Sequence, residues 1–428
     1  MDIYVVQPGD TLYGVALRFG VPMARLLEDN QLPNPARLVV GQTLVIQYPA
    51  VTHTVRSGET LTAIAASYGT TVRQLLRNNP GLGGRTGISP GQTLVISYQQ
   101  EREGILTVNG YAYPYIEQSL LERTLPYLTQ LAPFTYGITP EGTLVPLQDQ
   151  ALVDAALRMG VQPLLHLSTL TEEGSFSSQT AHAVLNDQAA QDRLAQALLE
   201  TISQKGYRGL DIDFEFLPGE DAQAYAQFVG RMRELLSPMG MPVLVALAPK
   251  VSADQPGTLY EGHNYRLLSQ AADFVLLMTY EWGYTYGPPM AVAPLPNVRR
   301  VVEYALTEMP AEKIYLGMPN YGYDWPLPFR QGGKATSISN QYAIELAARH
   351  SAAIRFDSQA QSPWFRYMDE NGTEHEVWFE DARSIRAKLA LTQEYGLYGV
   401  GYWNLMRPFP QNWVVLNALY DIREEPLF

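Results

Sequence analysis

After about residue 104, hydrophobic residues come in short runs that alternate with amphipathic stretches. Several runs are apolar at both odd and even positions, which is typical of parallel strands buried on both faces. The stretches between them, such as DRLAQALLETISQ, have the spacing of amphipathic helices. The runs lie at residues 105–112, 133–138, 162–169, 209–216, 242–249, 274–280, 313–320 and 397–404. Eight strand–helix units predict an α/β fold, a (β/α)8 TIM barrel over residues 104–428.

The stretch between the seventh and eighth runs is too long for a single helix. It contains RYMDENGTEHEVWF, in which Asn371 and Gly372 are typical turn residues of a β-hairpin. We therefore expect a small α+β insertion between strands 7 and 8, at about residues 325–379, that forms one wall of a cleft.

The first hundred residues contain an internal repeat. QPGDTL at 7–12 recurs as RSGETL at 56–61, and VGQTLVI at 40–46 recurs as PGQTLVI at 90–96. In each copy a helix capped by Thr11 or Thr60 is followed by a second, shorter helix and a strand. The repeat predicts two βααβ modules, at residues 1–48 and 49–98, followed by the polar stretch QQEREG.

Composition and charge exclude several classes of function. The formal net charge of −13 gives no general attraction to nucleic acid or to anionic membranes. With no cysteine, the chain has no disulfides, thiolate metal sites or cysteine nucleophiles. No apolar run approaches the ~18 residues of a membrane span, and no ordinary secretory signal is visible at the start. Aromatic residues make up 11% of the chain, and some of them could stack on sugar rings.

The sequence GLDIDFE at residues 209–215 carries three carboxylates at alternate positions. Because side chains alternate along a strand, Asp211, Asp213 and Glu215 share one face. The opposite, apolar face carries Leu210, Ile212, Phe214 and Phe216. Neighbouring carboxylates cannot all ionise freely, so one should hold its proton near neutral pH. A protonated Glu beside an ionised Asp is typical of glycosidases. A solvated edge strand and a divalent-cation site are the alternatives for this stretch, although no EF-hand spacing is present.

Aromatic and polar residues also gather where three other predicted strands end. They are Tyr280, Glu281 and Trp282 on the sixth strand, Asn320, Tyr321 and Tyr323 on the seventh, and Tyr402, Trp403 and Asn404 on the eighth. Barrel enzymes place their working residues at the carboxyl ends of strands, so we expect these side chains to meet Glu215. Carboxylates among aromatic rings indicate a sugar-binding pocket better than a metal or phosphate site.

The repeated N-terminal motifs closely resemble LysM modules, over residues 2–47 and 52–97. This resemblance implies binding to the N-acetylglucosamine face of peptidoglycan or chitin. The expected groove includes the loops that follow the first strands, with Gly9, Asp10 and Thr11 in one module and Gly58, Glu59 and Thr60 in the other.

The segments GLDIDFE, MTYEWG, GMPNYGYDW and GVGYWNL resemble the fourth, sixth, seventh and eighth strands of glycoside hydrolase family 18. With its LysM-like modules, the whole chain is similar to the spore-cortex-lytic N-acetylglucosaminidases of spore-forming bacteria. The resemblance implies a retaining, substrate-assisted mechanism. In it Glu215 is the acid, Asp213 orients the substrate's acetamido group, Tyr280 binds the acetamido carbonyl and Asp211 tunes Asp213. The implied sugar contacts are Trp403, Glu281, Trp282, Tyr321, Tyr323 and Asn320.

Two residues depart from the family pattern. Arg208 stands where the family usually has an Asp, and we expect this positive neighbour to help keep Asp211 ionised. Glu281 replaces the Asp that often follows the sixth-strand Tyr. Neither change removes the acid, the orienting Asp or the Tyr, so activity is expected.

The sequence therefore predicts hydrolysis of N-acetylglucosaminyl bonds in peptidoglycan, in spore cortex or its fragments. The alternatives are a chitinase acting on chitin oligosaccharides and a non-catalytic glycan-binding protein of the spore or cell wall. We expect glycans as partners, no nucleic-acid partner, no cofactor and no metal. A monomer located at the spore cortex, the coat or the cell wall is expected.

Overall fold

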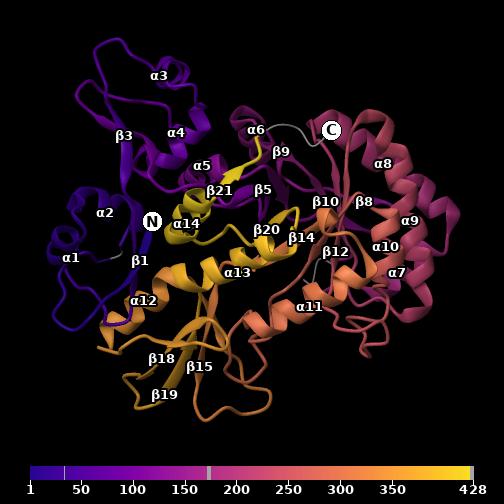
Figure 1. The fold of residues 1–428 in the computed structure, drawn as a ribbon. Coiled ribbons are helices and arrows are strands. Elements are labelled where there is room, and N and C mark those ends of the chain that lie inside the picture. Colours follow the sequence, from indigo (N-terminus) through magenta and orange to yellow (C-terminus); the bar gives the residue numbers. More distant parts are fainter. Residues whose placement is uncertain (33, 171–174, 425–428) are drawn as a thin grey trace.

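The computed structural model describes residues 1–32, 34–170 and 175–424. In Figure 1 the barrel occupies the right side and the two N-terminal modules lie at the left, with the insertion below. The elements fall within the domain boundaries expected from the sequence, and the boundaries themselves stay a prediction.

In the described chain, eight parallel strand positions form the barrel. They are β5 (Gly104–Ala112), β6 (Gln130–Pro133), β9 with β10 (Gln162–Pro163 and Leu165–Ser168), β11 (Leu210–Asp213), β12 (Val243–Leu247), β13 (Phe274–Leu277), β14 (Ile314–Pro319) and β20 (Gly399–Trp403). Each strand pairs in parallel with the next, and β20 pairs with β5. The ring closes except for the one-residue break at Leu164 between β9 and β10. This confirms the predicted barrel.

The second barrel strand begins earlier than the sequence suggested. Residues 133–138 were expected to form it, but β6 ends at Pro133. Gly137–Ile138 instead form β7, which pairs with β8 (Leu144–Val145) in a separate antiparallel hairpin. The prediction was wrong because β6 begins with the polar residue Gln130, which is buried and accepts a hydrogen bond from the Tyr315 hydroxyl at 3.0 Å.

Amphipathic helices cover the outside of the barrel, and they bury one apolar stripe each. The stripe of α9 places Tyr225 and Phe228 on Phe214, whose ring stacks on theirs at 5.4 and 5.7 Å. Full burial of such a side chain contributes roughly 1.5–3 kcal/mol, which fixes β11 against its helix. The described helices of the barrel are α5 (Gln118–Thr124), α6 (Gln150–Met159), α7 (Ser178–Leu185), α8 (Gln188–Lys205), α9 (Ala222–Leu236), α10 (Tyr265–Ala271), α11 (Leu295–Glu308), α13 (Ala382–Tyr395) and α14 (Pro410–Leu419). After α14, strand β21 (Tyr420–Ile422) pairs with the start of β5.

The segment between β14 and β20 forms the expected α+β insertion. Its described sheet has the antiparallel order β16-β15-β19-β18-β17. The β18–β19 hairpin turns at Asn371 and Gly372, as predicted, and Gly372 has a φ of 77°. The elements are β15 (Gly322–Pro326), β16 (Thr336–Ile338), α12 (Asn340–Arg349), β17 (Arg355–Asp357), β18 (Ser362–Met368) and β19 (Glu374–Trp378).

Each N-terminal module has the predicted βααβ order. The side chain of Thr11 accepts the Gly14 N–H at 3.0 Å, and that of Thr60 accepts the Ala63 N–H at 3.1 Å, so both caps are confirmed. The first module comprises β1 (Asp2–Val5), α1 (Leu12–Phe19), α2 (Met23–Asn30) and β2 (Thr43–Ile46). The second comprises β3 (Pro49–Thr54), α3 (Leu61–Ser67), α4 (Val72–Asn78) and β4 (Thr93–Tyr98).

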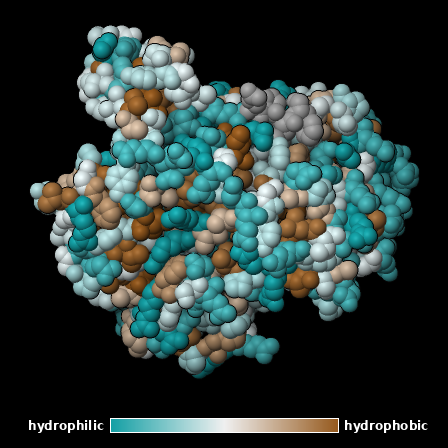
Figure 2. All heavy atoms as spheres, in the orientation of Figure 1, coloured by the Kyte–Doolittle hydropathy of each residue, from teal (hydrophilic) through white to brown (hydrophobic). Residues whose placement is uncertain are grey.

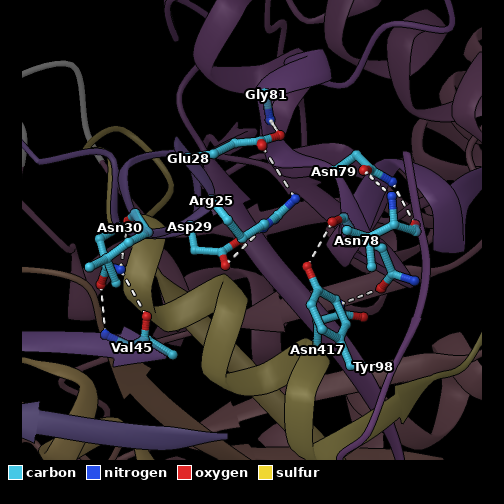
Figure 3. Close-up of polar contacts among 12 residues, drawn as sticks. Arg25, Glu28, Asp29, Asn30, Val45, Asn78, Asn79, Gly81, Tyr98 and Asn417 are labelled. Carbon is cyan, nitrogen blue, oxygen red and sulfur yellow. Dashed lines mark hydrogen bonds and ion pairs between the residues drawn. The ribbon is translucent and has the colours of Figure 1, made fainter. Parts of the chain in front are cut away.

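Both modules dock on α14 through buried amide side chains. Gln411 donates to the side chain of Asn30 at 3.0 Å in the first module. At the other end of the helix, Asn417 donates to Asn78 of the second module at 3.0 Å, beside the buried Arg25–Asp29 pair (Figure 3). These contacts hold both modules directly against α14 of the barrel.

The first module also contacts the insertion. The Ile354 N–H donates to the Val40 carbonyl at 2.9 Å. A Cβ at Gly41 would lie 1.8 Å from the Ile354 carbonyl oxygen, so only glycine allows this approach.

The surface in the view of Figure 2 carries its hydrophobic residues in small separate patches rather than in one large area. Within the described residues, no helix has the length and apolar character that crossing a membrane requires.

Candidate active site

Strand β11 carries the acidic side chains into the barrel. Leu210, Ile212 and Phe214 are fully buried in the main core, as the alternation predicted. Asp211 is 0% exposed and Asp213 is 5% exposed. Glu215 follows the strand, and the next residue, Phe216, has a left-handed φ of 58°. Such a conformation is unfavourable for a side chain with a Cβ and is frequent at functional sites.

A cavity of about 520 Å³ lies at the ends of β11, β12, β13 and β20. It is lined by six of the residues singled out in the sequence: Asp213, Glu215, Tyr280, Glu281, Trp282 and Trp403. Residues that are up to 190 positions apart in the chain thus share one cavity. Asp211, Asn320, Tyr321 and Tyr323 are not among its lining residues in the described chain.

Burial shifts the acidity of all three β11 carboxyl groups. It raises the pKa of Asp213 to about 7. Burial also raises the pKa of Glu215 well above its usual value, and the nearby charges of Asp213 and Glu281 raise it further. A carboxyl of this kind keeps its proton near neutral pH and can serve as a general acid.

Asp211 lies behind Asp213, beyond the lining of the cavity. Burial raises its pKa well above the usual value, and the Tyr111 hydroxyl offsets this only in part. No well-aligned hydrogen bond reaches either carboxyl oxygen from the described residues. Burial therefore favours the protonated form of the Asp211 carboxyl. The expectation that Arg208 keeps it ionised is wrong, because the Arg208 side chain is exposed, and its cation does not contribute to the Asp211 pKa.

Tyr280 reaches the carboxyl groups from the end of the sixth strand. It is buried, and burial together with the Asp213 and Glu215 charges raises its pKa, so its hydroxyl is neutral and can donate a hydrogen bond. Gly317 on β14 makes room for the ring, because a Cβ there would lie 2.9 Å from the Tyr280 ring.

Glu281 is held by two tyrosines from the seventh strand and the insertion. The Tyr321 hydroxyl donates to its carboxylate, and the Tyr323 hydroxyl does so at 3.1 Å. Burial raises the Glu281 pKa, and these two hydroxyls partly lower it. Tyr321 and Tyr323 therefore act on the cavity through Glu281. The insertion was expected to form a cleft wall, but none of the described insertion residues lines this cavity.

Asn320 has a structural role outside the lining of the cavity. Its side-chain amide donates to the carbonyl of Asn404 at 2.8 Å and to that of Arg407 at 2.9 Å. It thereby fixes the loop after β20. That loop follows Trp403, which packs edge-on against Phe134 at 4.8 Å and is tilted against Tyr111 at 5.8 Å. Its indole thus forms an aromatic side of the cavity.

Several cavity residues escaped the sequence reasoning. They are Tyr111, Tyr113, Phe134, His166, Phe176 and Tyr260. His166 and Ser168 occupy alternate positions of the third strand, in register with Asp211 and Asp213. A polar residue at every second position of an otherwise apolar strand is the same signal that marks β11, and it could have identified His166.

The six module residues predicted to contact glycan have structural roles here. Asp10 accepts the Gln7 N–H and Glu59 accepts the Arg56 N–H, both at 2.7 Å, which closes the same turn in both copies. Gly9 and Gly58 both have a φ of 85° in that turn. Contact of these loops with glycan stays a prediction.

Chemically, the cavity combines a proton donor, a second carboxyl that ionises near neutrality, a neutral phenol and an indole. The proton donor can protonate the leaving oxygen of an acetal, and the second carboxyl, when ionised, can stabilise a positive charge beside it. The aromatic rings suit the apolar face of a sugar.

Two family descriptions match the chain. Glycosyl hydrolases family 18 matches residues 171–407, and the LysM domain matches residues 4–47 and 53–97. The cortical fragment-lytic enzyme of Bacillus subtilis is 41% identical to the chain, with 99% of each sequence covered.

Solved structures show the same relationship. The crystal structure of the spore cortex-lytic enzyme SleL of Bacillus megaterium has a TM-score of 0.84 and 37% identity, and 99% of each chain is covered. A chitinase of Chromobacterium violaceum has a TM-score of 0.68 and 26% identity over 73% of this chain and 98% of its own.

Proposed function

The chain belongs to glycoside hydrolase family 18 and contains two LysM domains, and from this premise we propose that it hydrolyses N-acetylglucosaminyl bonds in the peptidoglycan of spore cortex or its fragments. The observation that supports the proposal most is the cavity that Glu215, Asp213 and Tyr280 line together. The relatives named as cortex-lytic enzymes, aligned over 99% of the chain, favour peptidoglycan as the substrate.

In the proposed first step, the Glu215 carboxyl transfers its proton to the glycosidic oxygen. The bond from the anomeric carbon to that oxygen breaks, and the carbonyl oxygen of the substrate's own acetamido group bonds to the anomeric carbon from the other face. The product is an oxazolinium ion and a free hydroxyl on the leaving sugar. The Asp213 carboxylate stabilises the positive charge of the acetamido N–H, and the Tyr280 hydroxyl positions the acetamido oxygen.

In the second step, water attacks the anomeric carbon while the Glu215 carboxylate takes one of its protons. The bond to the acetamido oxygen breaks, and the new hydroxyl stands on the face that the leaving group occupied. Two inversions give net retention. Burial disfavours the ionised form of Asp211, which limits the negative charge beside Asp213.

The remaining proposed sugar contacts follow from the cavity lining. Trp403 and Trp282 offer aromatic faces to the sugar rings. Glu281 accepts hydrogen bonds from sugar hydroxyls while Tyr321 and Tyr323 hold it in place. We propose that the LysM domains bind glycan chains, so that a monomeric enzyme stays on the cortex or cell wall.

The test compares the full chain with Glu215→Gln and with Glu220→Gln, an exposed carboxyl five residues on. Each is incubated with cortical fragments and with chitooligosaccharides, and new reducing ends are identified by mass spectrometry. Glu215→Gln should lower kcat by roughly 10²–10⁴-fold while glycan binding persists, and Glu220→Gln should leave kcat unchanged. Unchanged turnover in Glu215→Gln would refute the assignment of the acid.

The same digest separates the candidate substrates. New reducing-end N-acetylglucosamine from cortical fragments supports the proposal. If only chitooligosaccharides are cleaved, the second candidate, a chitinase, replaces it; the chitinase of similar fold supports that alternative. If neither glycan is cleaved although both bind, the chain is a glycan-binding protein.

A further inference from the structure

His166 lies within reach of the residues that carry the proposed reaction, but that mechanism gives it no task. We propose that His166 is a positioning residue: its neutral ring holds the Asp213 carboxylate through the Nε2–H group. This inference rests on the function proposed above. It assigns a proton donor to a carboxylate that has few other donors around it.

The position of His166 is set by the barrel. Strand β10 pairs with β11 so that His166 lies opposite Asp211 and Ser168 lies opposite Asp213. The His166 Nε2 atom is 3.8 Å from Asp213 Oδ2. This is longer than a formed hydrogen bond, but such contacts in ligand-free active sites often shorten when substrate binds. The other oxygen, Asp213 Oδ1, is buried without a partner among the described residues.

A hydroxyl lies against the far side of the ring. Thr135 Oγ1 lies 2.6 Å from His166 Nδ1 and 3.0 Å from Ser168 Oγ. Either hydroxyl of the Thr135–Ser168 pair can donate to the other; the proposal requires Ser168 to donate to Thr135 and Thr135 to donate to Nδ1, which leaves the hydrogen of the ring on Nε2. Ser168 Oγ in turn accepts the Leu170 N–H at 3.2 Å. In this arrangement the series of hydrogen bonds leaves the Nε2–H group of His166 to donate to Asp213.

The ring acts as a dipole and not as a cation. His166 is 1% exposed, and its ring centroid lies 4.8 Å from that of Phe134 and 5.4 Å from that of Tyr111. Burial lowers the His166 pKa to about 3, so the ring is neutral near pH 7. The neutral His166 ring can therefore donate to the Asp213 carboxylate throughout the reaction without changing its own protonation state.

The other groups around Asp213 are acids and phenols. Asp211 and Glu215 lie on its own strand segment, and Glu281 lies across the cavity. Burial opposes ionisation of Asp213. The phenols come from other elements: Tyr111 on β5, Tyr225 on α9 and Tyr280 after β13. Loss of the His166 donor should therefore make Asp213 harder to ionise.

The proposal predicts a change in the pH profile that a purely structural role would not produce. His166→Phe keeps a flat buried ring but has no N–H. It should lower kcat roughly 10- to 100-fold, the effect of losing a hydrogen bond to a charged group, with little change in KM. The acid limb of the kcat/KM profile should move to higher pH, because Asp213 must be ionised for turnover. His166→Gln keeps an N–H donor and should restore part of both losses.

The control is His182→Gln, because the His182 side chain is 54% exposed on α7 and pairs with Asp221 outside the cavity. It should match the wild type in kcat and in pH profile. A His166→Phe variant with the wild-type rate and acid limb would overturn the proposal. The proposed function fails separately, if the wild-type chain cleaves neither cortical fragments nor chitooligosaccharides.

A measurement on the unmutated chain guards against a variant that fails to fold. The protein has 6 histidines, so ¹⁵N-histidine spectra are simple, and the signal that is missing from the His166→Gln spectrum assigns His166. The expected state is a neutral ring with the hydrogen on Nε2 from pH 5 to pH 8. A charged ring, or a hydrogen on Nδ1, would also overturn the proposal.

Discussion

Replacing Asp213 by Asn should make the free protein more stable at alkaline pH while removing its activity. Burial raises the Asp213 pKa to about 7 in the folded chain, whereas the unfolded value is about 3.9. Between these two pH values the folded state holds a proton that the unfolded state has lost. The contribution of Asp213 to stability is therefore greatest below about pH 4, and it is lost as the pH rises from about 4 through 7.

The size of the effect follows from the pKa difference. About three units at 1.36 kcal/mol each give a loss of roughly 4 kcal/mol between pH 4 and pH 8. The unfolding entropy of 428 residues is about 0.9 kcal/mol/K, so the loss corresponds to about 4–5 °C in Tm. Asn is neutral at every pH and does not contribute this loss.

The assay is differential scanning calorimetry at pH 4.5, 6 and 8 on the wild type, Asp213→Asn and Glu234→Gln. Glu234 is an exposed carboxyl on α9 and serves as the control. The Tm of Asp213→Asn should exceed that of the wild type by about 1 °C at pH 4.5 and by about 4–5 °C at pH 8. A Tm difference that stays constant, or that falls as the pH rises, would refute the reasoning about the buried carboxyl groups.

Three further predictions follow from the site and the modules. Glu281→Gln removes a charge that raises the Glu215 pKa, so the alkaline limb of the kcat/KM profile should move to lower pH in a pH–rate series. Gly317→Ala should destabilise the protein by about 1–3 kcal/mol and lower kcat on chitooligosaccharides, since its Cβ would lie 2.4 Å from the Leu277 carbonyl oxygen and 2.9 Å from the Tyr280 ring. Asn79→Ala should cost about 1–3 kcal/mol and expose the second module to limited proteolysis, because that amide bridges α4 and β4.

Two of these predictions have a matched comparison. Gly230→Ala on α9 meets only the Ala271 Cβ at 3.8 Å and should stabilise the helix by about 1 kcal/mol. Asn30→Ala removes the equivalent amide of the first module. The argument about Glu281 would be contradicted if the alkaline limb of Glu281→Gln moved to higher pH. The argument about Gly317 would be contradicted if both glycine variants lost the same stability. The argument about Asn79 would be contradicted if Asn79→Ala were cleaved no faster than the wild type in limited proteolysis.

The period-two pattern of GLDIDFE was enough to predict the site strand and its two faces. The pattern works because one strand face packs against a helix, here through Phe214 on α9, while the other faces the barrel interior. The repeat likewise predicted the βααβ modules and their threonine caps. Residues that act through another side chain were harder to place. Tyr321 and Tyr323 follow a predicted barrel strand in the sequence, and they were therefore expected at the cavity. In the structure their hydroxyls donate to Glu281 instead.

The docking of the modules could not be predicted from local patterns. Gln411 and Asn417 on α14 would be taken for surface residues by composition, yet both are buried. Their partners Asn30 and Asn78 lie more than 300 residues earlier in the chain. A helix buried on all sides has no polar face to reveal its orientation, so its neighbours become apparent only from the fold.

Burial of the acidic face has two opposed consequences. The same exclusion of water that raises the Glu215 pKa, and so supplies a proton donor at neutral pH, also costs stability wherever Asp213 must ionise. A variant that stabilises the protein by neutralising this face must therefore lose activity, as Asp213→Asn should. A variant that stabilises a helix outside the cavity, such as Gly230→Ala, carries no such penalty. The relation between stability and turnover should thus depend on whether a substitution touches β11.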